Sequence, residues 1–246
     1  MDKLVIDIGN TSTKIAIFRN KELLRVQTYQ QFDKHALQML FNFYPTITHS
    51  IISSVAETPA FLEPYLSKYT KLVRWDASHL LPMHVAYRDL HSLGQDRLAI
   101  AKASAALYPN KEVLSIALGT CITYNFVDKE NVFYGGAISP GLKMRYKALN
   151  YYTHALPLLD VQIEKINDLI GLTTQDSIQI GVLKSVWYEL EGNIAAYTRK
   201  FPKIVTIITG GDANYFEMSL KNRIFALPNL VLIGLNEILD LNVSKT

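Results

Sequence analysis

The sequence predicts an α/β protein with two similar lobes, and three observations carry that prediction. Runs rich in β-branched residues alternate with stretches whose apolar residues recur at helical spacing. Two segments, LVIDIGNTSTKIAIF (4–18) and VLSIALGTCITYNFV (113–127), share a strand, a glycine-threonine turn and a second strand. Their glycines, Gly9 and Gly119, lie 110 positions apart in a chain of 246 residues. We therefore expect a duplicated α/β unit, with lobes at 1–112 and 113–246.

The remaining elements follow from local patterns along the chain. The first expected helix begins after an Asp33 cap, and the second carries Pro59 in its first turn. Apolar residues at helical spacing predict helices at 32–44, 57–69, 95–108 and 173–201. Runs of β-branched residues predict further strands at 49–55, 71–75 and 204–209. The last segment, NLVLIGLNEIL (229–239), is expected to be a strand that bends at Gly234 into a short helix.

Charge and cysteine content narrow the functional class. The net charge is +3, and no cluster of Lys and Arg is longer than RNK or TRK, so we expect no nucleic-acid partner. A single cysteine, Cys121, excludes an internal disulfide and fits a reducing compartment. No leader pattern and no apolar run of about 18 residues occurs, so we expect a cytoplasmic protein without membrane contact. Histidines lack metal-ligand spacing, which predicts no zinc site.

The first hairpin places a carboxylate, Asp7, inside a strand that otherwise looks buried. The turn after it is made of Gly, Asn, Thr and Ser and ends at Lys14. Backbone N–H groups beside a glycine, hydroxyl groups and a lysine are what a phosphate needs at short range. The spacing is neither that of a P-loop nor that of a dinucleotide fingerprint, because a strand follows the turn. A purely structural hairpin is the alternative, but it leaves Asp7 unexplained.

Three other motifs have both a functional and a structural interpretation. LGTCIT (118–123) repeats the glycine-threonine turn, and such a turn is also common in purely structural hairpins. TGGDA (209–213) follows a buried strand, where two glycines admit a ligand or simply form a tight turn. LGQDRL (93–98) puts Asp96 at a helix start, as a cap or as a general base beside the cation Arg97.

Taken together, the motifs resemble those of type III pantothenate kinases. DIGNTSTK, GQDR, LGTCIT, GGAISPG and TGGDA occur in the order found in that family, and the resemblance spans roughly residues 4–240. It implies two ribonuclease-H-like lobes, a duplicated actin-like fold, with an ATP cleft between them. It also implies ATP-dependent phosphorylation of pantothenate to 4'-phosphopantothenate, the first step of coenzyme A biosynthesis, by a homodimer.

The resemblance also implies roles for individual residues. Asp96 is expected to be the catalytic base, and Asp7 to lie near the Mg²⁺ that accompanies ATP. The residues expected at the ATP phosphates are Asp7, Ile8, Gly9, Asn10, Thr11, Ser12, Thr13, Lys14, Thr120, Gly210 and Gly211. Those expected at pantothenate are Tyr87, Gly94, Gln95, Asp96, Arg97 and Thr174, the last of them contributed across a dimer interface.

One position departs from the family pattern. The second hairpin of the family usually reads D-x-G-T, and its acid is associated with a monovalent cation, typically potassium. Here Ala117 takes the place of that acid. A methyl group cannot ligate K⁺ or NH₄⁺, so the chain is independent of the cation, uses another ligand, or is impaired. We expect independence, because Asp96 and the first phosphate turn are present.

Two alternative functions stay open at this point. A different small-molecule kinase of the same fold would carry similar phosphate hairpins, so GQDR is the motif that discriminates against it. A nucleotide-binding regulator without catalytic activity is favoured by the missing acid at position 117, whereas the lack of a basic patch disfavours direct binding to DNA.

Overall fold

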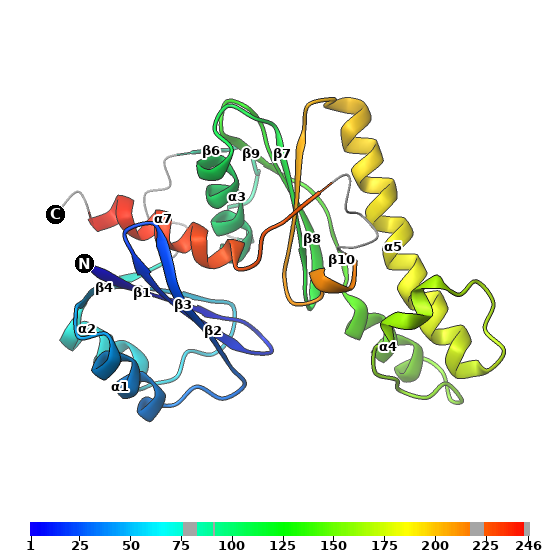
Figure 1. The fold of residues 1–246 in the computed structure, drawn as a ribbon, viewed down its shortest axis with the longest axis horizontal. Coiled ribbons are helices and arrows are strands. Elements are labelled where there is room, and N and C mark those ends of the chain that lie inside the picture. Colours follow the sequence, from blue (N-terminus) through cyan, green and yellow to red (C-terminus); the bar gives the residue numbers. More distant parts are fainter. Residues whose placement is uncertain (76–82, 91, 217–223, 244–246) are drawn as a thin grey trace. The chain divides into compact units, whose positions relative to one another are not determined.

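The computed structural model describes residues 1–75, 83–90, 92–216 and 224–243. The chain forms two compact units (Figure 1). The first unit comprises residues 1–109, 130–134 and 229–246, and the second comprises residues 110–129 and 135–228. In the described residues, no helix is both long enough and apolar enough to cross a bilayer.

The first unit is built on a five-stranded sheet in the order β3-β2-β1-β4-β5. Strands β1 to β3 are antiparallel, whereas β4 runs parallel to β1 and β5 parallel to β4. The strands are β1 (Asp2–Ile8), β2 (Thr13–Arg19), β3 (Glu22–Tyr29), β4 (Ile47–Ser54) and β5 (Lys71–Arg74). The helices are α1 (Lys34–Phe43), α2 (Leu62–Tyr69), α3 (Gln95–Leu107) and α7 (Leu230–Val243).

Alternation along β1 decides which helices cover which face of this sheet. Leu4, Ile6 and Ile8 pack in one apolar cluster with the buried leucines of α1 and α2. On the opposite face Lys3 forms an ion pair of 2.6 Å with Asp240 of α7, and α7 covers β1 and β4 there (Figure 1). Asp7 belongs to the same face as Lys3, because both positions are odd. The predicted Asp33 cap of α1 is confirmed by a 2.8 Å bond that the Ala36 N–H donates to its carboxylate.

Two of the predicted elements were wrong in this unit. The segment 229–239 is not a strand but the greater part of α7. Helix α7 packs against the alanine-rich α3 so closely that a Cβ on Gly234 would lie 1.9 Å from the carbonyl oxygen of Ala99. Helix α2 begins at Leu62, so Pro59 precedes it instead of opening it. A short parallel pair, β6 (His84–Val85) with β9 (Val132–Gly135), completes the unit.

The second unit repeats the pattern of the first around its own hairpin. Strand β7 pairs antiparallel with β8 and parallel with β11, as β1 pairs with β2 and β4. The strand order β12-β11-β7-β8 belongs to a seven-stranded sheet that continues with β9 and β6, and β10 also pairs with β8. The strands are β7 (Val113–Leu118), β8 (Cys121–Val127), β10 (Ile138–Pro140), β11 (Val205–Thr209) and β12 (Phe225–Ala226).

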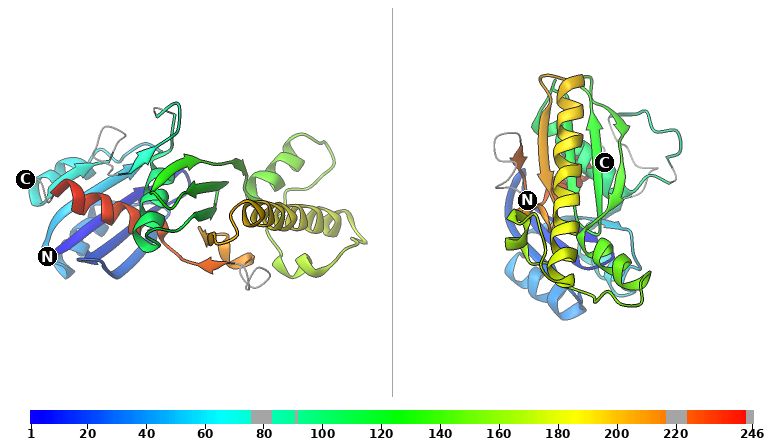
Figure 2. Two further views of the ribbon diagram at one scale, coloured as in Figure 1. Left: turned by 90° about the horizontal axis from the view of Figure 1, so that it is seen from above. Right: turned by 90° about the vertical axis from the view of Figure 1, so that its right-hand side faces the viewer.

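Helix α5 (Thr174–Lys200) is the long helix that the sequence predicts, and it covers one face of the second sheet (Figure 2). Its residues Leu183, Val186 and Leu190 are fully buried and pack in one cluster with Ile116 and Tyr124 of the sheet. The short elements of this unit are α4 (Leu142–Tyr151) and the 3-10 helices η1 (Ile163–Asn167) and η2 (Ala213–Tyr215).

Candidate active site

The turn between β1 and β2 is closed by its own backbone. The Gly9 N–H donates a 3.1 Å hydrogen bond to the Ser12 carbonyl, and the exposed Asn10 and Thr11 lie between them. Asp7 and Lys14 face each other across the hairpin, and Ser53 of β4 is the parallel neighbour of Asp7. The turn therefore presents hydroxyl, amide and ammonium groups beside one carboxylate, as the sequence predicts.

Asp7 and Asp96 lie close enough to affect each other electrostatically. Burial raises the pKa of Asp7 to about 6, and the negative charge of Asp96 contributes to this rise, while Lys14 opposes it. Asp96 is in the first turn of α3, which Gly94 precedes. A Cβ on Gly94 would lie 2.5 Å from Asp96 Oδ1, so the Asp96 carboxylate occupies the space above this glycine. The glycine of GQDR therefore leaves room for the carboxylate of its acid.

The side chain of Gln95 connects the start of α3 to the central sheet. The hydroxyl group of Ser53 donates to Gln95 Oε1 over 3.5 Å, and Ser53 is buried. Ser53 was missed in the sequence, where it is one of several small residues ending a strand. The signal that could have found it is its register opposite Asp7, which becomes visible only once β1 and β4 are paired.

The guanidinium group of Arg97 contacts two aromatic rings. Only 4% of Arg97 is exposed, and its guanidinium carbon lies 5.8 Å from the centre of the Tyr87 ring and 5.9 Å from that of Phe133. Both distances fit cation–π contacts. The structure thus brings together Tyr87 and Arg97, two residues expected at pantothenate. Phe133 was missed, because nothing in the sequence separates it from an ordinary core phenylalanine.

In the second unit, the turn after β7 and the turn after β11 meet. The Asp212 N–H donates a 3.1 Å hydrogen bond to the Leu118 carbonyl. Gly210 has a φ of +100°, and a Cβ there would lie 2.2 Å from the Leu118 oxygen, so only glycine fits. Gly211 has open space around it. The turn that contains Gly210 and Gly211 therefore lies beside the end of β7, which leads into the turn that contains Thr120.

Asp212 is the residue of this group of turns that the site prediction omitted. Burial raises the pKa of its half-buried carboxyl group, and the charge of Lys143 opposes that shift. The signal was present in the sequence, because Asp212 directly follows the two glycines of TGGDA. Ala117 lies in register with Thr209 on the neighbouring strand, three residues before Asp212. Asp212 gives this group of turns a carboxyl group, although position 117 has none.

Thr174 lies elsewhere in the second unit. It is exposed and opens α5, whose cap is Thr173: the Thr173 hydroxyl oxygen accepts a 3.1 Å bond from the Asp176 N–H. Ser185, which contacts Arg145 of α4, lies eleven residues further along the helix, or about 16 Å at 1.5 Å per residue. Thr174 therefore lies at the N-terminal end of α5, eleven residues before the residue that contacts Arg145.

Asp7 is the acidic group beside the donor-rich turn of the first hairpin. In the part of the chain that the structure describes, no three His, Cys, Asp or Glu side chains gather in a way that could hold a metal. Magnesium bound to ATP takes most of its ligands from phosphates and water and needs one or two carboxylates. Asp7, partly buried beside the donor-rich turn, supplies such a carboxylate.

Comparison with known proteins agrees with the motifs. The family profile described as type III pantothenate kinase matches residues 3–196. The type III pantothenate kinase of Christiangramia forsetii is 42% identical over 243 residues, which cover 98% of this chain and 99% of that protein. The type III pantothenate kinase of Cytophaga hutchinsonii is 41% identical over 247 residues, with coverage of 98% and 99%.

Solved structures support the fold independently of sequence. A ROK family glucokinase from Streptomyces griseus, in complex with glucose and AMPPNP, superposes with a TM-score of 0.53 at 10% identity, covering 99% of this chain and 100% of that one. This likeness confirms the predicted duplicated actin-like fold and, at such low identity, says nothing about the substrate. The profile and the two relatives match over most of the chain: it belongs to the type III pantothenate kinase family.

Proposed function

We propose that the chain catalyses the ATP-dependent phosphorylation of pantothenate to 4'-phosphopantothenate, the first step of coenzyme A biosynthesis. Membership of the family supports this activity. The observation that carries it is the placement of the Asp96 carboxylate over Gly94 in GQDR, close to Asp7 and its donor-rich turn. A base for the acceptor and a turn for the phosphates are the two parts that a kinase needs.

In the proposed reaction Asp96 accepts the proton of the terminal hydroxyl group of pantothenate. The hydroxyl oxygen forms a bond to the γ-phosphorus of ATP, and the bond between that phosphorus and the β–γ bridging oxygen breaks, releasing ADP. General-base assistance of this kind contributes roughly 10²–10⁴-fold to the rate. Most of the remaining acceleration comes from positioning and from neutralising charge on the phosphates.

Lys14 and the N–H and hydroxyl groups of the 9–13 turn would bind the phosphates, together with Thr120, Gly210 and Gly211. Asp7 would hold the Mg²⁺ of the nucleotide, which supplies positive charge to the phosphates when bound. A cation at Asp7 also favours the ionised form of a carboxyl group whose pKa is otherwise raised to about 6. Asp212 is proposed as a further nucleotide contact, because its half-buried carboxyl group adjoins Gly211.

Tyr87, Gly94, Gln95 and Arg97 would line the pantothenate site. The buried cation of Arg97, which contacts the rings of Tyr87 and Phe133, supports a role in attracting the carboxylate of pantothenate. Thr174 would complete the site from a second copy of the chain. The exposed apolar side chains of Leu169, Ile170 and Leu172, just before Thr174, support a homodimer.

The direct test is an assay of ADP formation with pantothenate and with a panel of sugars and carboxylic acids, each with and without K⁺ or NH₄⁺. We expect turnover with pantothenate alone and no dependence on the monovalent cation, because Ala117 cannot ligate it. Turnover of another acceptor would assign a different kinase activity. Binding of ATP without turnover in any salt would make the chain a nucleotide-binding regulator, and strict cation dependence would assign the ion to another ligand.

A further inference from the structure

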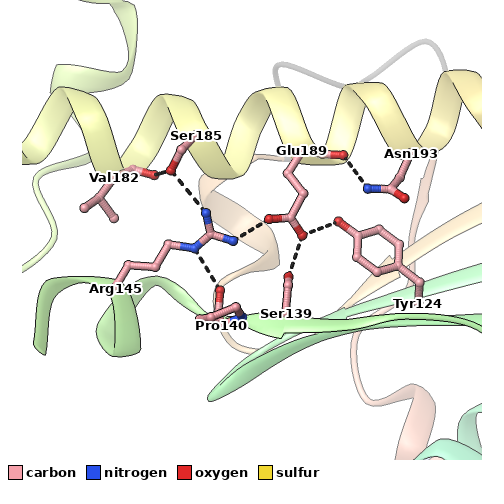
Figure 3. A network of polar contacts seen from close by, with 8 residues as sticks. All are labelled: Tyr124, Ser139, Pro140, Arg145, Val182, Ser185, Glu189 and Asn193. Atoms are coloured by element: carbon pink, nitrogen blue, oxygen red, sulfur yellow. Dashed lines mark hydrogen bonds and ion pairs between the residues drawn. The ribbon is translucent and has the colours of Figure 1, made fainter. Parts of the chain in front are cut away.

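A network of polar side chains in the second unit centres on Glu189 of α5 (Figure 3). Tyr124 of β8 and Ser139 of β10 donate their hydroxyl groups to Glu189 Oε1 over 2.9 and 2.5 Å. Arg145 of α4 forms an ion pair with Oε2 of the same carboxylate. One acid of α5 therefore connects to β8, β10 and α4, which lie between residues 121 and 151.

Arg145 extends the network to the backbone of the segment before α4. Its Nε donates a 2.9 Å hydrogen bond to the Pro140 carbonyl, and its Nη1 donates to Ser185 Oγ of α5 over 3.2 Å. Ser185 in turn donates to the Val182 carbonyl. Glu189 thus binds the side chain of Ser139, while Arg145 binds the main chain of Pro140.

The environment of Glu189 keeps it ionised. Burial would raise its pKa, but hydrogen bonds from Ser139, Arg145 and Tyr124 outweigh burial and lower the pKa below its ordinary value. A partly buried ion pair of this kind is weak evidence for stability, because desolvation offsets much of the attraction. Its better-supported use in proteins is to specify one geometry among several, so the question is which geometry it specifies.

The geometry that the network specifies is that of the Gly119–Thr120 turn, which the proposed function assigns to ATP. Residues 138–140 pair with β8 directly after that turn, with Pro140 opposite Cys121. The Gly141 N–H then donates a 3.1 Å hydrogen bond to the Thr120 carbonyl. A Cβ on Gly141 would lie 2.0 Å from the Gly119 oxygen, so the segment presses directly on the turn. Strand β10 has only three residues, so the side-chain contacts of Glu189 and Arg145 add to a short run of backbone pairing.

We propose that Glu189 and Arg145 are positioning residues for nucleotide binding: they clamp residues 139–141 on the Gly119–Thr120 turn, which then presents its donors to the ATP phosphates in one geometry. The proposal rests on the proposed function, because that function assigns the turn to ATP. Neither side chain needs to touch the nucleotide.

The test compares E189Q with E191Q in the full-length protein. Glutamine keeps the shape of Glu189 and removes the charge that faces Arg145. Glu191 lies on the same helix and, among the described residues, makes no ion pair or side-chain hydrogen bond, so E191Q is the matched control. The Kd of Mg-ATP is measured by titration calorimetry, and KM is measured separately for ATP and for pantothenate.

We expect E189Q to raise the Kd and KM of ATP about tenfold, the scale of a small misplacement of a binding group, with the KM of pantothenate within about twofold. E191Q should match the wild type. Because E189Q leaves the Arg145 cation uncompensated, the double variant E189Q/R145Q should bind ATP better than the product of the two single effects predicts. A lower Tm for E189Q with an unchanged Kd of ATP would overturn the proposal and leave the network a purely structural role.

A second variant covers the case in which E189Q does not fold. S139A removes one hydroxyl group and no charge, and it should weaken ATP binding about threefold, the scale of one hydrogen bond; an unchanged Kd of ATP would overturn the proposal. The calorimetric readout also separates the two hypotheses. If the wild type binds ATP without phosphorylating pantothenate, the proposed function fails, while weaker binding by E189Q would still support the clamp.

Discussion

Two carboxyl groups in the first unit, those of Asp7 and Asp96, lie close together and carry different parts of the proposed chemistry. Asp7 sits in a strand and is partly buried, so burial and the charge of Asp96 raise its pKa to about 6. Asp96 sits at the first turn of a helix, over a glycine that leaves it room. The two acids therefore occupy different environments, and their proposed roles rest on the positions of their motifs, with Asp7 beside the phosphate turn and Asp96 in GQDR.

The cost of burying Asp7 gives a prediction about stability and pH. The folded protein binds a proton at Asp7 more tightly than the unfolded chain, whose pKa is 3.8, so this group lowers the free energy of unfolding as pH rises from about 4 to about 6. A shift of about two pKa units corresponds to at most about 3 kcal/mol. Asp7→Asn should therefore raise Tm at pH 7.5 by several degrees and leave it nearly unchanged at pH 4.

Thermal unfolding followed at both pH values checks this expectation. Asp160→Asn, at an exposed carboxyl group, is the control and should shift Tm equally little at both. The same Asp7→Asn protein should bind Mg-ATP more weakly than the wild type. Equal Tm shifts at the two pH values would show that burial of Asp7 costs the fold nothing.

Asp96→Asn tests the assigned base. The amide keeps the shape above Gly94 and cannot accept the proton, so kcat should fall roughly 10²–10⁴-fold. The Kd of ATP and Tm should stay close to those of the wild type, because the proposed function assigns Asp96 to the acceptor and not to ATP. Phosphopantothenate formation at a near-normal rate would mean that another group is the base; Asp160→Asn again serves as the control.

At the residue scale, the sequence identified the residues of the turns but not the residues of other elements that contact the same motifs. Asp7, Gly94 and Gly210 lie inside motifs whose glycines and acids have a local physical reason. Ser53 lies beside Asp7 through strand pairing, and Phe133 contacts Arg97 through packing. No local sequence pattern therefore predicts either residue. Asp212 was within reach of sequence reasoning, because an acid after two glycines at a strand end is itself an unusual pattern.

At the scale of elements, the glycine pair of TGGDA offers a matched comparison. Gly210 has a left-handed φ, and a Cβ there would lie 2.2 Å from the Leu118 oxygen, whereas a Cβ on Gly211 would meet nothing within 4 Å. Gly210→Ala should therefore destabilise the second unit by roughly 1–3 kcal/mol, and Gly211→Ala should leave stability nearly unchanged. Chemical denaturation of both variants measures the difference. Equal stability of the two would show that the turn relaxes freely around position 210.

The terminal helix shows where sequence patterns fail at this scale. NLVLIGLNEIL is apolar on almost all sides, since Leu230, Leu232, Leu235, Ile238 and Leu239 are all buried. A short run that is apolar all round has no clear period, so strand and helix cannot be told apart from it. Packing decides the outcome: Gly234 allows close contact with the alanines of α3, and a helix supplies the surface for that contact. The long amphipathic pattern of α5 was predicted correctly because its length excludes a strand.

At the scale of the whole molecule, the duplication explains both the match and the departure from the family pattern. Both units place a hairpin beside a parallel strand, and in both the turn after the first strand is the candidate phosphate contact. Only the first hairpin retains an acid, since Ala117 replaces it in the second. The division into lobes at residues 112 and 113 stays a prediction; the two compact units of the structure divide the chain between residues 109 and 110 and give residues 130–134 and 229–246 to the first unit. The homodimer also stays a prediction.

The homodimer gives the prediction that belongs to the whole molecule. Leu169, Ile170 and Leu172 are 73, 76 and 90% exposed, and three such side chains in four residues are costly to leave in water. They directly precede Thr174, so an interface that covers them would also bring Thr174 to the partner. Leu172→Glu should therefore convert a dimer to a monomer in light scattering and raise the KM of pantothenate, with the Kd of ATP little changed.

Phe43→Glu is the matched control for this change, because Phe43 is 64% exposed at the end of α1 in the other unit. It introduces the same charge at an exposed apolar position and should leave both mass and KM unchanged. A monomer with an unaltered KM of pantothenate would separate dimerisation from the substrate site and remove Thr174 from it. A wild type that is monomeric at micromolar concentration would contradict the dimer itself, and the exposed leucines would then need a different partner.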